Sequence, residues 1–456
     1  MKVLLISVNN EAEPYPVAPI GVMYLARALK DKGHDVNIFD LCFVEDDLQA
    51  IKDAIKGFSP DVIGISIRNI DNLTYNKSVF YLPRIKKIVD AIRNYTSAPV
   101  VVGGSGFSIF SGEVLKYLNL DIGIVGDGEV AFPMYLDAMS NSGDIYHIPN
   151  LCYIKDDELK LNPLQYSHPN LLPDRSLLDN KKYLELGGMG NIQSKRGCPF
   201  KCAYCTYPGI NGDRLRLREP GDVAEELKEM VSEYGIDYAF FIDDIFNIPE
   251  EHASAICEEI IRKGLKIDWT CFATPKGMTR ELAGLMKEAG CKGVEFGTDA
   301  CSERTLKGLN KHFTLDDIAS SAECCKSVDL PNAHYIIIGG PGEDELTLNE
   351  TLALFDKIKP TAIIALIGVR IYPNTGLHKR AIEENIIEKN RNLLEPVFYL
   401  TPEMDIEIIF QKISEHAEQR HNWIVPGLNI RCDNKVLTML RQMGKRGPLW
   451  DMLAYQ

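Results

Sequence analysis

The sequence lacks an apolar run long enough to cross a membrane, which takes roughly 18 or more residues. It shows no signal peptide either, because Met1-Lys2 leads directly into a predicted strand. Positive charge is in deficit: the formal net charge is -14, which disfavours a nucleic-acid polyanion as the main partner. We therefore expect a cytoplasmic protein with no membrane span and no nucleic-acid partner.

A disulfide framework is also missing. The 12 cysteines among 456 residues follow no regular overall spacing, which is typical of reduced thiols in a cytosol. Hydrophobic residues make up 45% and charged residues 25% of the chain, as in ordinary globular proteins. The length suggests two or three domains.

One stretch of cysteines does have a meaningful spacing. Cys198, Cys202 and Cys205 form a C-x3-C-x2-C pattern in the segment 194–207. Thiolates at such spacing can converge on one soft metal centre, as iron–sulfur clusters and zinc sites require. A structural zinc usually takes four ligands in paired motifs, and the nearest other cysteines, Cys152 and Cys257, are far away and unpaired. Three ligands instead fit a four-iron cluster with one open iron.

At these residues the chain resembles the radical S-adenosylmethionine (SAM) superfamily, whose signature is this C-x3-C-x2-C pattern with an aromatic residue, here Tyr204, before the last cysteine. The resemblance implies a [4Fe-4S] cluster held by Cys198, Cys202 and Cys205. It also implies that the open iron binds SAM, whose reductive cleavage yields a 5′-deoxyadenosyl radical. The motif says little about the substrate.

Residues 1–145 carry five short apolar runs that alternate with helical patterns. This alternation is typical of a doubly wound, Rossmann-like parallel sheet, whose ligands bind beyond the carboxyl ends of the strands. After the fourth run, Gly103–Gly106 would let the backbone approach a large flat ligand closely, although such glycines also serve as simple turn formers. No G-x-G-x-x-G dinucleotide fingerprint follows the first run.

Several of these turns together resemble the cobalamin-binding domain that precedes many radical SAM enzymes: Pro19-Ile20-Gly21, Gly33–Val36, Asp61–Ser66, Val102–Gly104 and Gly126–Glu129. The D-x-H-x-x-G motif of methionine-synthase-like cobalamin domains is missing, so no histidine is available there as a lower ligand of cobalt. The segment 68–72 either lines that lower face or caps the next helix. The cobalamin contacts that the resemblance implies are Asn9, Ile20, Gly21, Ser66, Arg68, Asn69, Ile70, Gly103, Gly104, Ser105, Gly126 and Glu129.

Residues 186–375 show six β/α units, which match the (β/α)6 partial TIM barrel of the radical SAM family. Active residues of such barrels gather at the carboxyl ends of strands. By resemblance, Asp243 or Asp244 accepts hydrogen bonds from the SAM ammonium, and Asp299 contacts the ribose, although many relatives carry glutamate there. Arg370 is a candidate for a phosphate or carboxylate contact. The complete set of expected SAM-side contacts is Tyr204, Asp243, Asp244, Thr298, Asp299, Gly339, Gly340, Pro341, Gly342, Glu343 and Arg370.

The predicted architecture is therefore α/β: a cobalamin-binding domain (1–145), a proline-punctuated linker (146–185), a partial barrel (186–375) and a small C-terminal region (376–456). In this last region we expect Tyr399, His421, Trp423 and Trp450 to pack on the barrel rather than to close the cavity.

The architecture resembles that of cobalamin-dependent radical SAM methyltransferases, which add a methyl group to an unactivated carbon by means of the 5′-deoxyadenosyl radical and methylcobalamin. The implied cofactors are a [4Fe-4S] cluster, SAM and cobalamin. The implied partners are a small-molecule or peptide substrate and an external electron donor such as flavodoxin or ferredoxin. One alternative is a non-methylating cobalamin-dependent oxidoreductase, cyclase or rearrangement enzyme. Another is a cluster-bearing binding or redox-sensing protein, which the strand-end carboxylates and the glycine-rich turn disfavour. The net charge and the absence of a second cysteine cluster disfavour a tRNA-methylthiolating enzyme.

Overall fold

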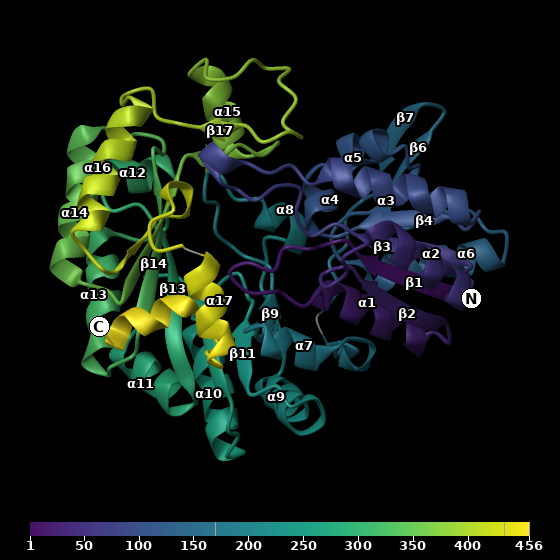
Figure 1. Cartoon of the computed structure of the whole chain (residues 1–456), viewed down its shortest axis with the longest axis horizontal. Coiled ribbons are helices and arrows are strands. Elements are labelled where there is room, and N and C mark those ends of the chain that lie inside the picture. The colour runs from purple at the N-terminus through teal and green to yellow at the C-terminus, as the bar shows by residue number, and fades with distance from the viewer. Residues whose placement is uncertain (169, 433, 456) are drawn as a thin grey trace.

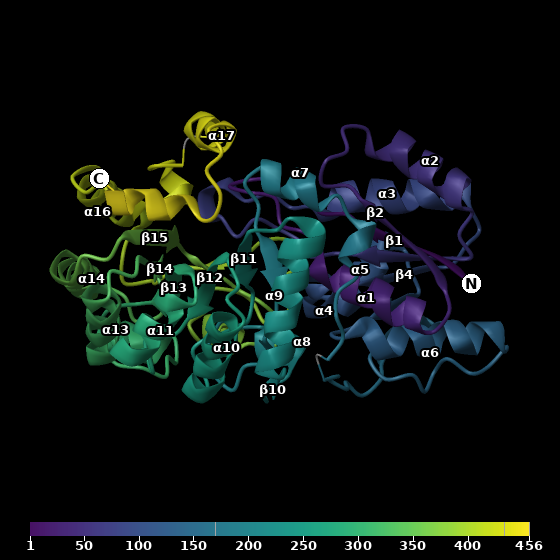
Figure 2. The same cartoon turned by 90° about the horizontal axis from the view of Figure 1, so that it is seen from below.

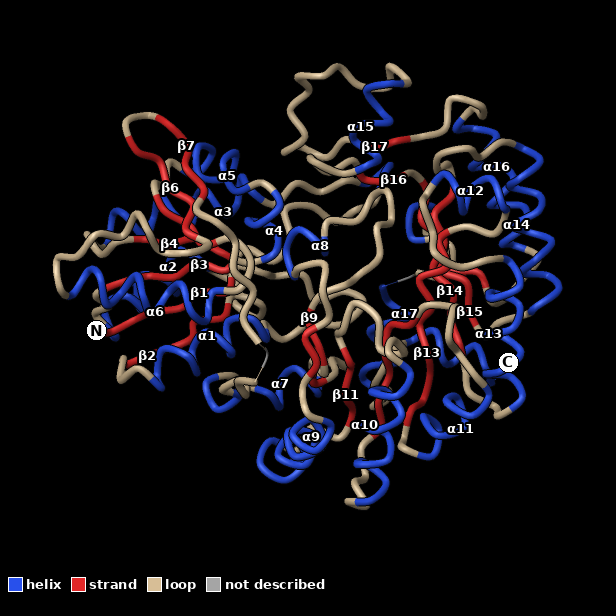
Figure 3. Tube along the Cα trace, turned by 180° about the vertical axis from the view of Figure 1, so that it is seen from behind, coloured by secondary structure: helices blue, strands red, loops and turns tan. Residues whose placement is uncertain are grey.

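The structure is a computed structural model that describes residues 1–168, 170–432 and 434–455. It consists of two mainly parallel sheets that lie next to each other, with helices packed around both (Figure 1). The N-terminal sheet and the barrel sheet face each other across a middle zone of loops and the short helix α8 (Tyr207–Asn211) (Figure 3). This arrangement confirms the predicted α/β class.

The N-terminal sheet has the strand order β2-β1-β3-β4-β5-β6-β7. Its first five strands pair in parallel, and the last two add as an antiparallel hairpin. The strands are β1 (Lys2–Ser7), β2 (Asp35–Asp40), β3 (Val62–Ser66), β4 (Val100–Gly103), β5 (Ile122–Ile124), β6 (Leu151–Lys155) and β7 (Glu158–Leu161).

Alternate residues of these strands build two cores, because neighbouring side chains of a strand point to opposite faces. Leu4 and Ile6 pack on the face covered by α2, α3 and α5, whereas Val3 and Leu5 pack on the face covered by α1 and α6. Figure 2 shows α2 and α3 on one side of this sheet and α1 and α6 on the other. The sheet is thus buried on both sides, as parallel sheets are. The helices are α1 (Ile20–Asp31), α2 (Asp47–Phe58), η1 (Tyr75–Lys77), α3 (Leu82–Tyr95), α4 (Ser105–Ile109), α5 (Ser111–Leu118) and α6 (Gly128–Ser140).

The segment predicted as a linker contributes to the N-terminal sheet. Its strands β6 and β7 extend this sheet to Leu161, past the expected boundary at residue 145. The chain then crosses to the barrel through η2 (Arg175–Leu177) and α7 (Asn180–Glu185). Arg175, fully buried in this crossing, pairs with Glu226 of the barrel at 2.7 Å and fixes its course.

The barrel sheet has the order β18-β15-β14-β13-β12-β11-β8, with every pair parallel. Six of its strands are those predicted, and β18 is an addition supplied by the C-terminal region. The strands are β8 (Gly190–Ile192), β11 (Tyr238–Phe241), β12 (Asp268–Ala273), β13 (Cys291–Asp299), β14 (Asn332–Ile338), β15 (Ala362–Ile367) and β18 (Trp423–Ile424).

Helices cover the outside of this sheet, and local sequence fixes where several of them begin. Thr314 and Asp344 form capping boxes that satisfy the first free backbone N–H groups of α13 and α14. Gly235, in the left-handed region, ends α9. The helices are α9 (Pro220–Tyr234), α10 (Glu250–Arg262), α11 (Arg280–Glu288), α12 (Glu303–Gly308), α13 (Leu315–Ser327) and α14 (Glu345–Ile358).

Part of the C-terminal region packs on the barrel, as expected: Trp423 and Trp450 are buried against its strands. The expectation fails for the other two side chains, because Tyr399 is buried in the core of the N-terminal sheet and His421 is exposed. Trp450 lies against Gly293, near the amino end of β13. The remaining elements are β9 (Lys195–Arg196) paired with β10 (Arg216–Leu217), β16 (Val369–Arg370) paired with β17 (Phe398–Tyr399), α15 (Gly376–Glu383), α16 (Ile406–Glu418), η3 (Pro426–Leu428), α17 (Asn434–Gln442) and η4 (Leu449–Tyr455). No helix within the described ranges is both long and apolar enough to span a membrane.

Candidate active site between the two sheets

A cavity of about 740 Å³ lies where the carboxyl ends of the two sheets face each other. Its walls come from the loops after β1, β3, β4 and β5, from the cysteine loop, and from the barrel strands β11 to β14. Ligand sites of open α/β sheets and of barrels both lie at strand carboxyl ends. In this protein the site of the N-terminal sheet and the site of the barrel form one cavity.

The structure brings most of the sequence-predicted residues to this cavity. Those that line it are Asn9, Ile20, Gly21, Ser66, Arg68, Gly103, Gly104, Ser105, Gly126, Glu129, Cys198, Cys202, Tyr204, Cys205, Asp243 and Asp244. Those that lie outside its wall are Asn69, Ile70, Thr298, Asp299, Gly339, Gly340, Pro341, Gly342, Glu343 and Arg370.

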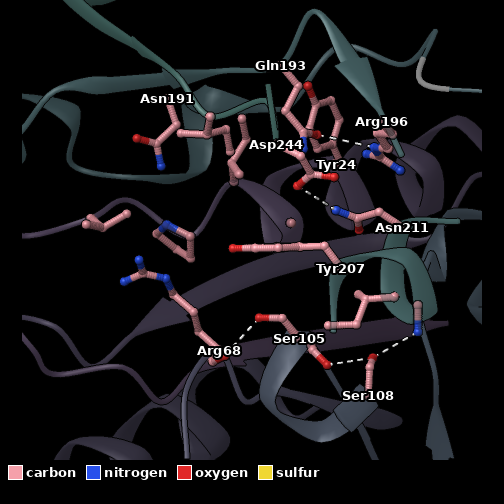
Figure 4. Close-up of a pocket in the computed structure, with 18 of the residues that line it drawn as sticks. Tyr24, Arg68, Ser105, Ser108, Asn191, Gln193, Arg196, Tyr207, Asn211 and Asp244 are labelled. Carbon is pink, nitrogen blue, oxygen red and sulfur yellow. Dashed lines mark hydrogen bonds between the residues drawn. The ribbon is translucent and has the colours of Figure 1, made fainter. Parts of the chain in front are cut away.

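The edge of the N-terminal sheet is open because its loops carry small residues. Gly104 has φ 97°, and a Cβ there would lie 2.6 Å from the Ile67 carbonyl oxygen, so only glycine fits. Ser105 Oγ donates to the Arg68 carbonyl at 2.8 Å. Ser108 Oγ donates to the Gly104 carbonyl at 2.8 Å and accepts from the Gly126 N–H at 2.9 Å (Figure 4). These bonds hold three loops of the edge in one surface that a large flat group can approach.

Arg68 projects into the cavity from this edge (Figure 4). Its guanidinium makes no hydrogen bond or ion pair with any residue that the structure describes, and the side chain is exposed. Among the described residues, the only histidine that lines the cavity is His312, which belongs to the barrel. The edge therefore fits a corrinoid whose cobalt receives no histidine from this domain.

The cysteine loop is held by backbone hydrogen bonds. Cys198 N–H donates to the Gly212 carbonyl at 3.1 Å, and Ala203 N–H donates to the Leu309 carbonyl at 2.8 Å. Gly197 has φ 92°, and a Cβ there would lie 2.1 Å from the Arg214 carbonyl oxygen. The loop thus places all three cysteines on the cavity wall.

The donor set of this loop fits an iron–sulfur cluster. Burial raises the pKa of Cys198 to about 11 and that of Cys205 to about 12, so both are thiols that lose a proton when they bind metal. Among the described residues, no three His, Cys, Asp or Glu side chains converge closely enough to hold a single metal ion. In a four-iron cluster each cysteine binds a different iron, so the sulfur atoms stand farther apart than the ligands of one ion.

The adjacent carboxylates Asp243 and Asp244 have different surroundings. Asp243 is 1% exposed and accepts from the Ser194 N–H at 2.7 Å, the Lys195 N–H at 3.1 Å and the Ser194 hydroxyl. Asp244 has one contact, from Asn211 Nδ2 at 3.4 Å, and its Oδ2 has no partner (Figure 4). Burial raises the pKa of Asp244 to about 6. Asp243 therefore anchors the strand before the cysteines, and Asp244 is the carboxylate available to a ligand.

Asp299 lies beside the cysteine loop rather than on the cavity wall. Its carboxylate pairs with Lys311 Nζ at 2.6 Å and accepts from the hydroxyl of Tyr204. Lys311 and Tyr204 both line the cavity. The neighbouring Thr298 bonds to His334 Nδ1 at 2.7 Å. Asp299 thus positions two cavity-lining side chains.

The glycine-rich turn Gly339–Glu343 packs against the C-terminal region. Thr401 N–H donates to the Gly339 carbonyl at 2.8 Å, and Thr401 Oγ1 donates to the Glu343 carbonyl at 2.6 Å. The Glu343 carboxylate accepts from the Gly339 N–H, and burial raises the pKa of Glu343 to about 7. The SAM contacts expected from this turn stay a prediction.

Arg370 is buried and bonded throughout to protein groups. Its Nε lies 3.0 Å from Asp71 Oδ2, and its other nitrogens donate to the carbonyls of Ile371 at 2.7 Å and Leu393 at 2.8 Å. These contacts join the N-terminal domain to the chain that follows the barrel. Arg370 could make the expected contact with a phosphate or carboxylate only if it gave up some of these hydrogen bonds.

Two prominent features of the site are absent from the sequence-based prediction. Arg196, two residues before Cys198, pairs with Asp127 at 3.2 Å and with Glu129 at 2.7 Å. This buried pairing joins the cysteine loop to the turn after β5. The only indication of it in the sequence is the basic residue that stands next to the cysteine motif. Tyr15, in the loop before α1, also lines the cavity, and no pattern in that loop indicates it.

Comparison with known families agrees with this two-part site. The "Radical SAM superfamily" profile matches residues 192–355, and the "B12 binding domain" profile matches residues 6–136. The barrel with its cysteine loop is thus a radical SAM domain, and the N-terminal sheet is a B12-binding domain.

Individual proteins match over most of the chain. It is 28% identical, over 85% of its own length and 84% of the relative's, to "Uncharacterized methyltransferase PH0819" of Pyrococcus horikoshii. It is 24% identical, over 82% and 74%, to "Tryptophan 2-C-methyltransferase" of Streptomyces laurentii. The solved structure of the radical SAM methyltransferase TsrM from Kitasatospora setae, with cobalamin and a [4Fe-4S] cluster bound, superposes with TM-score 0.89 at 23% identity, covering 99% of this chain and 97% of that one. This superposition extends the fold agreement to the whole chain.

Proposed function

Because the chain belongs to the radical SAM superfamily and also carries a B12-binding domain, we propose that it is a cobalamin-dependent methyltransferase that acts on an unactivated carbon. The observation that carries this proposal is the shared cavity. The cysteine loop and the open edge of the N-terminal sheet line one space, so a radical-generating group and a methyl carrier would lie close to the same substrate.

Different residues of the chain are assigned to the cluster, to SAM and to cobalamin. Cys198, Cys202 and Cys205 would hold the cluster, and Asp244 would accept hydrogen bonds from the ammonium of SAM. The glycine edge around Gly103 and Gly104 would receive cobalamin, and Arg68, which lines the same part of the cavity, would lie beside it. When bound, these groups supply reductive cleavage of SAM and delivery of a methyl group; the protein orients them and excludes water.

The remaining contacts are assigned by their position in the fold. Asp299 orients Tyr204 and Lys311 next to the cluster. Arg196 holds the segment before the cysteine loop against the turn after β5, because its guanidinium pairs with Asp127 and Glu129 of that turn. The cavity is therefore a unit in which the two domains set each other's position.

The relatives named above point to a small-molecule substrate, and the cavity between the sheets has the size for one. We further propose that the protein is cytoplasmic and that flavodoxin or ferredoxin reduces its cluster. A reducing compartment suits its free cysteines, three of which would hold an oxygen-sensitive cluster.

Product analysis tests the proposal. The anaerobically reconstituted enzyme, given SAM, cobalamin, a reductant and a candidate substrate, should yield methylated product and S-adenosylhomocysteine. Turnover that alters the substrate without any S-adenosylhomocysteine would assign the chain to the non-methylating oxidoreductases, cyclases or rearrangement enzymes instead.

A further inference from the structure

The cysteine loop has an inner and an outer side. Cys198, Cys202 and Cys205 line the cavity. Pro199 and Lys201, which stand between these cysteines in the sequence, are exposed and do not belong to the cavity wall. The outer side is thus the part of the loop that another protein can reach.

Two further loops border this outer side. Asn310, in the loop after α12, donates from its Nδ2 to the Lys201 carbonyl at 2.5 Å. The ring of His312, in the same loop, stacks on Phe200 with 3.3 Å between centroids. The Nε2 of His312 forms a hydrogen bond of 2.9 Å with Oγ1 of Thr274, in the loop after β12. The three loops are therefore joined beside the cluster site, and we call their exposed surface the outer face.

The charged residues of the outer face are all basic. Its segments 199–212, 274–278 and 304–313 contain no aspartate or glutamate, although the whole chain has 64 acidic residues against 50 Lys and Arg. Arg304 and Lys311 are engaged by carboxylates from outside these segments. One exposed lysine from each segment pairs with no carboxylate among the described residues: Lys201, Lys276 and Lys307.

This local charge decides which partner the outer face can attract. Charges in solution are screened beyond about 8 Å at physiological ionic strength. A docking protein therefore responds to the residues that it approaches more than to the formal net charge of -14. Complementary charges speed the formation of a complex and fix its orientation. A basic face on an acidic chain fits an acidic partner.

The centre of the outer face is less polar than its rim. Pro199 is exposed there, next to the half-buried, stacked rings of Phe200 and His312. Protein interfaces commonly combine an apolar centre with a polar rim. The flat, apolar ring edge of a flavin suits this centre.

We propose that the outer face, with Lys201, Lys276 and Lys307 at its rim, is the docking surface for an acidic flavoprotein electron carrier of the flavodoxin class. One electron passes from the anionic flavin hydroquinone to the cluster. The flavin becomes the neutral semiquinone, so no proton moves and no heavy-atom bond forms or breaks. This inference rests on the proposed function, which requires a reduced cluster, and identifies where the electron donor binds.

Anaerobic stopped-flow spectroscopy of the holoenzyme without SAM tests the proposal, with flavodoxin hydroquinone as the donor and semiquinone formation as the signal. In the triple variant Lys201→Glu, Lys276→Glu, Lys307→Glu the second-order rate constant should fall about tenfold at low ionic strength. Added salt should slow the native reaction, because it screens the attraction, but not the reaction of the variant. Equal rate constants in the two proteins would overturn the proposal.

A small reductant separates docking from damage to the cluster site. Photoreduced 5-deazariboflavin is uncharged and needs no docking surface, so it should reduce the native protein and the triple variant at nearly equal rates. A variant that both reductants reduce equally slowly has an altered cluster, and the proposal is then wrong. The proposal also fails if deazariboflavin reduces the native enzyme and flavodoxin does not.

A matched variant tests whether position or net charge matters. Lys32→Glu, Lys87→Glu, Lys326→Glu changes the net charge equally at exposed lysines that have no ion pair among the described residues and lie outside the outer face. It should keep the native rate with flavodoxin, and a rate as low as that of the first variant would reject the docking surface. If the first triple variant does not fold, Lys276→Glu alone should still slow the reaction, and an unchanged rate would contradict the proposal.

Two other outcomes distinguish the donor and the function. A ferredoxin that reduces the enzyme faster than flavodoxin does, with the same dependence on the three lysines, would overturn the flavoprotein as the partner. Slower electron transfer in the triple variant without any S-adenosylhomocysteine from the native enzyme would retain the docking surface and reject methylation. Methyl transfer with equal electron-transfer rates in native protein and triple variant would do the reverse.

Discussion

Replacing Asp244 by asparagine tests the assignment of the SAM-binding carboxylate. The substitution keeps the size of the side chain and its contact with Asn211 but removes the negative charge whose Oδ2 has no partner. A hydrogen bond to a charged group contributes about 1.5–3 kcal/mol. The loss corresponds to roughly a 10-fold to 150-fold increase in the Kd for SAM.

The assay is equilibrium dialysis of SAM against the cluster-loaded protein, with Asp243→Asn as the contrasting variant. The carboxylate of Asp243 already accepts three hydrogen bonds from Ser194 and Lys195. Its replacement should therefore lower the melting temperature, while the Kd for SAM of correctly folded, cluster-loaded protein stays nearly unchanged. A SAM affinity that is unchanged in Asp244→Asn and reduced in Asp243→Asn would refute the assignment.

The pH dependence follows from the same contact. Burial raises the pKa of Asp244 to about 6 in the free protein, and the ammonium of SAM requires the ionised form. SAM affinity should therefore fall as the pH decreases through about 6, and this decline should be absent from Asp244→Asn. A native profile that is flat across this range would contradict Asp244 as the partner of the ammonium.

Three further predictions concern the two domains. Replacing Cys198, Cys202 and Cys205 together by alanine should abolish cluster iron and 5′-deoxyadenosine formation; iron retained at native stoichiometry would contradict the cluster assignment. Arg196→Met should lower the free energy of unfolding by about 3–5 kcal/mol, because it leaves the buried carboxylates of Asp127 and Glu129 without this partner; denaturant titration measures this loss, and a change below 1 kcal/mol would show that the domains are held elsewhere. Paramagnetic resonance of the bound Co(II) cobalamin should show no nitrogen ligand from a protein histidine; a nitrogen hyperfine splitting that changes when the protein's histidines are labelled with 15N would contradict the absence of a histidine ligand from the N-terminal domain.

The sequence predicted the fold to within a few residues for most strands. Buried strands such as β3 and β14 could be predicted because they carry clustered apolar β-branched residues, Val62, Ile63 and Ile65 in the first and three isoleucines at 336–338 in the second. β18 could not be predicted, because two residues, Trp423 and Ile424, carry no periodicity. Its place next to β15 depends on the packing of the C-terminal region.

The candidate site was predictable where the chemistry is local. The cysteine loop is a compact motif, and the glycines after β4 and β5 could be placed at the site because they directly follow strands that the sequence indicates. The choice between Asp243 and Asp244 was not predictable, because adjacent residues share one local pattern and differ only in their partners. The ion pair of Arg370 with Asp71 joins residues that are 299 positions apart, a contact that no local pattern in a single sequence indicates.

The most direct test of the central claim is the ratio of two products from one reaction. With the true substrate, the reconstituted enzyme should form S-adenosylhomocysteine and 5′-deoxyadenosine together, roughly one to one if the target is an sp3 carbon, because one SAM molecule restores the methyl group and another is cleaved. Quantitative mass spectrometry over several turnovers measures both. Sustained formation of 5′-deoxyadenosine and altered substrate with no S-adenosylhomocysteine would contradict the assignment as a methyltransferase.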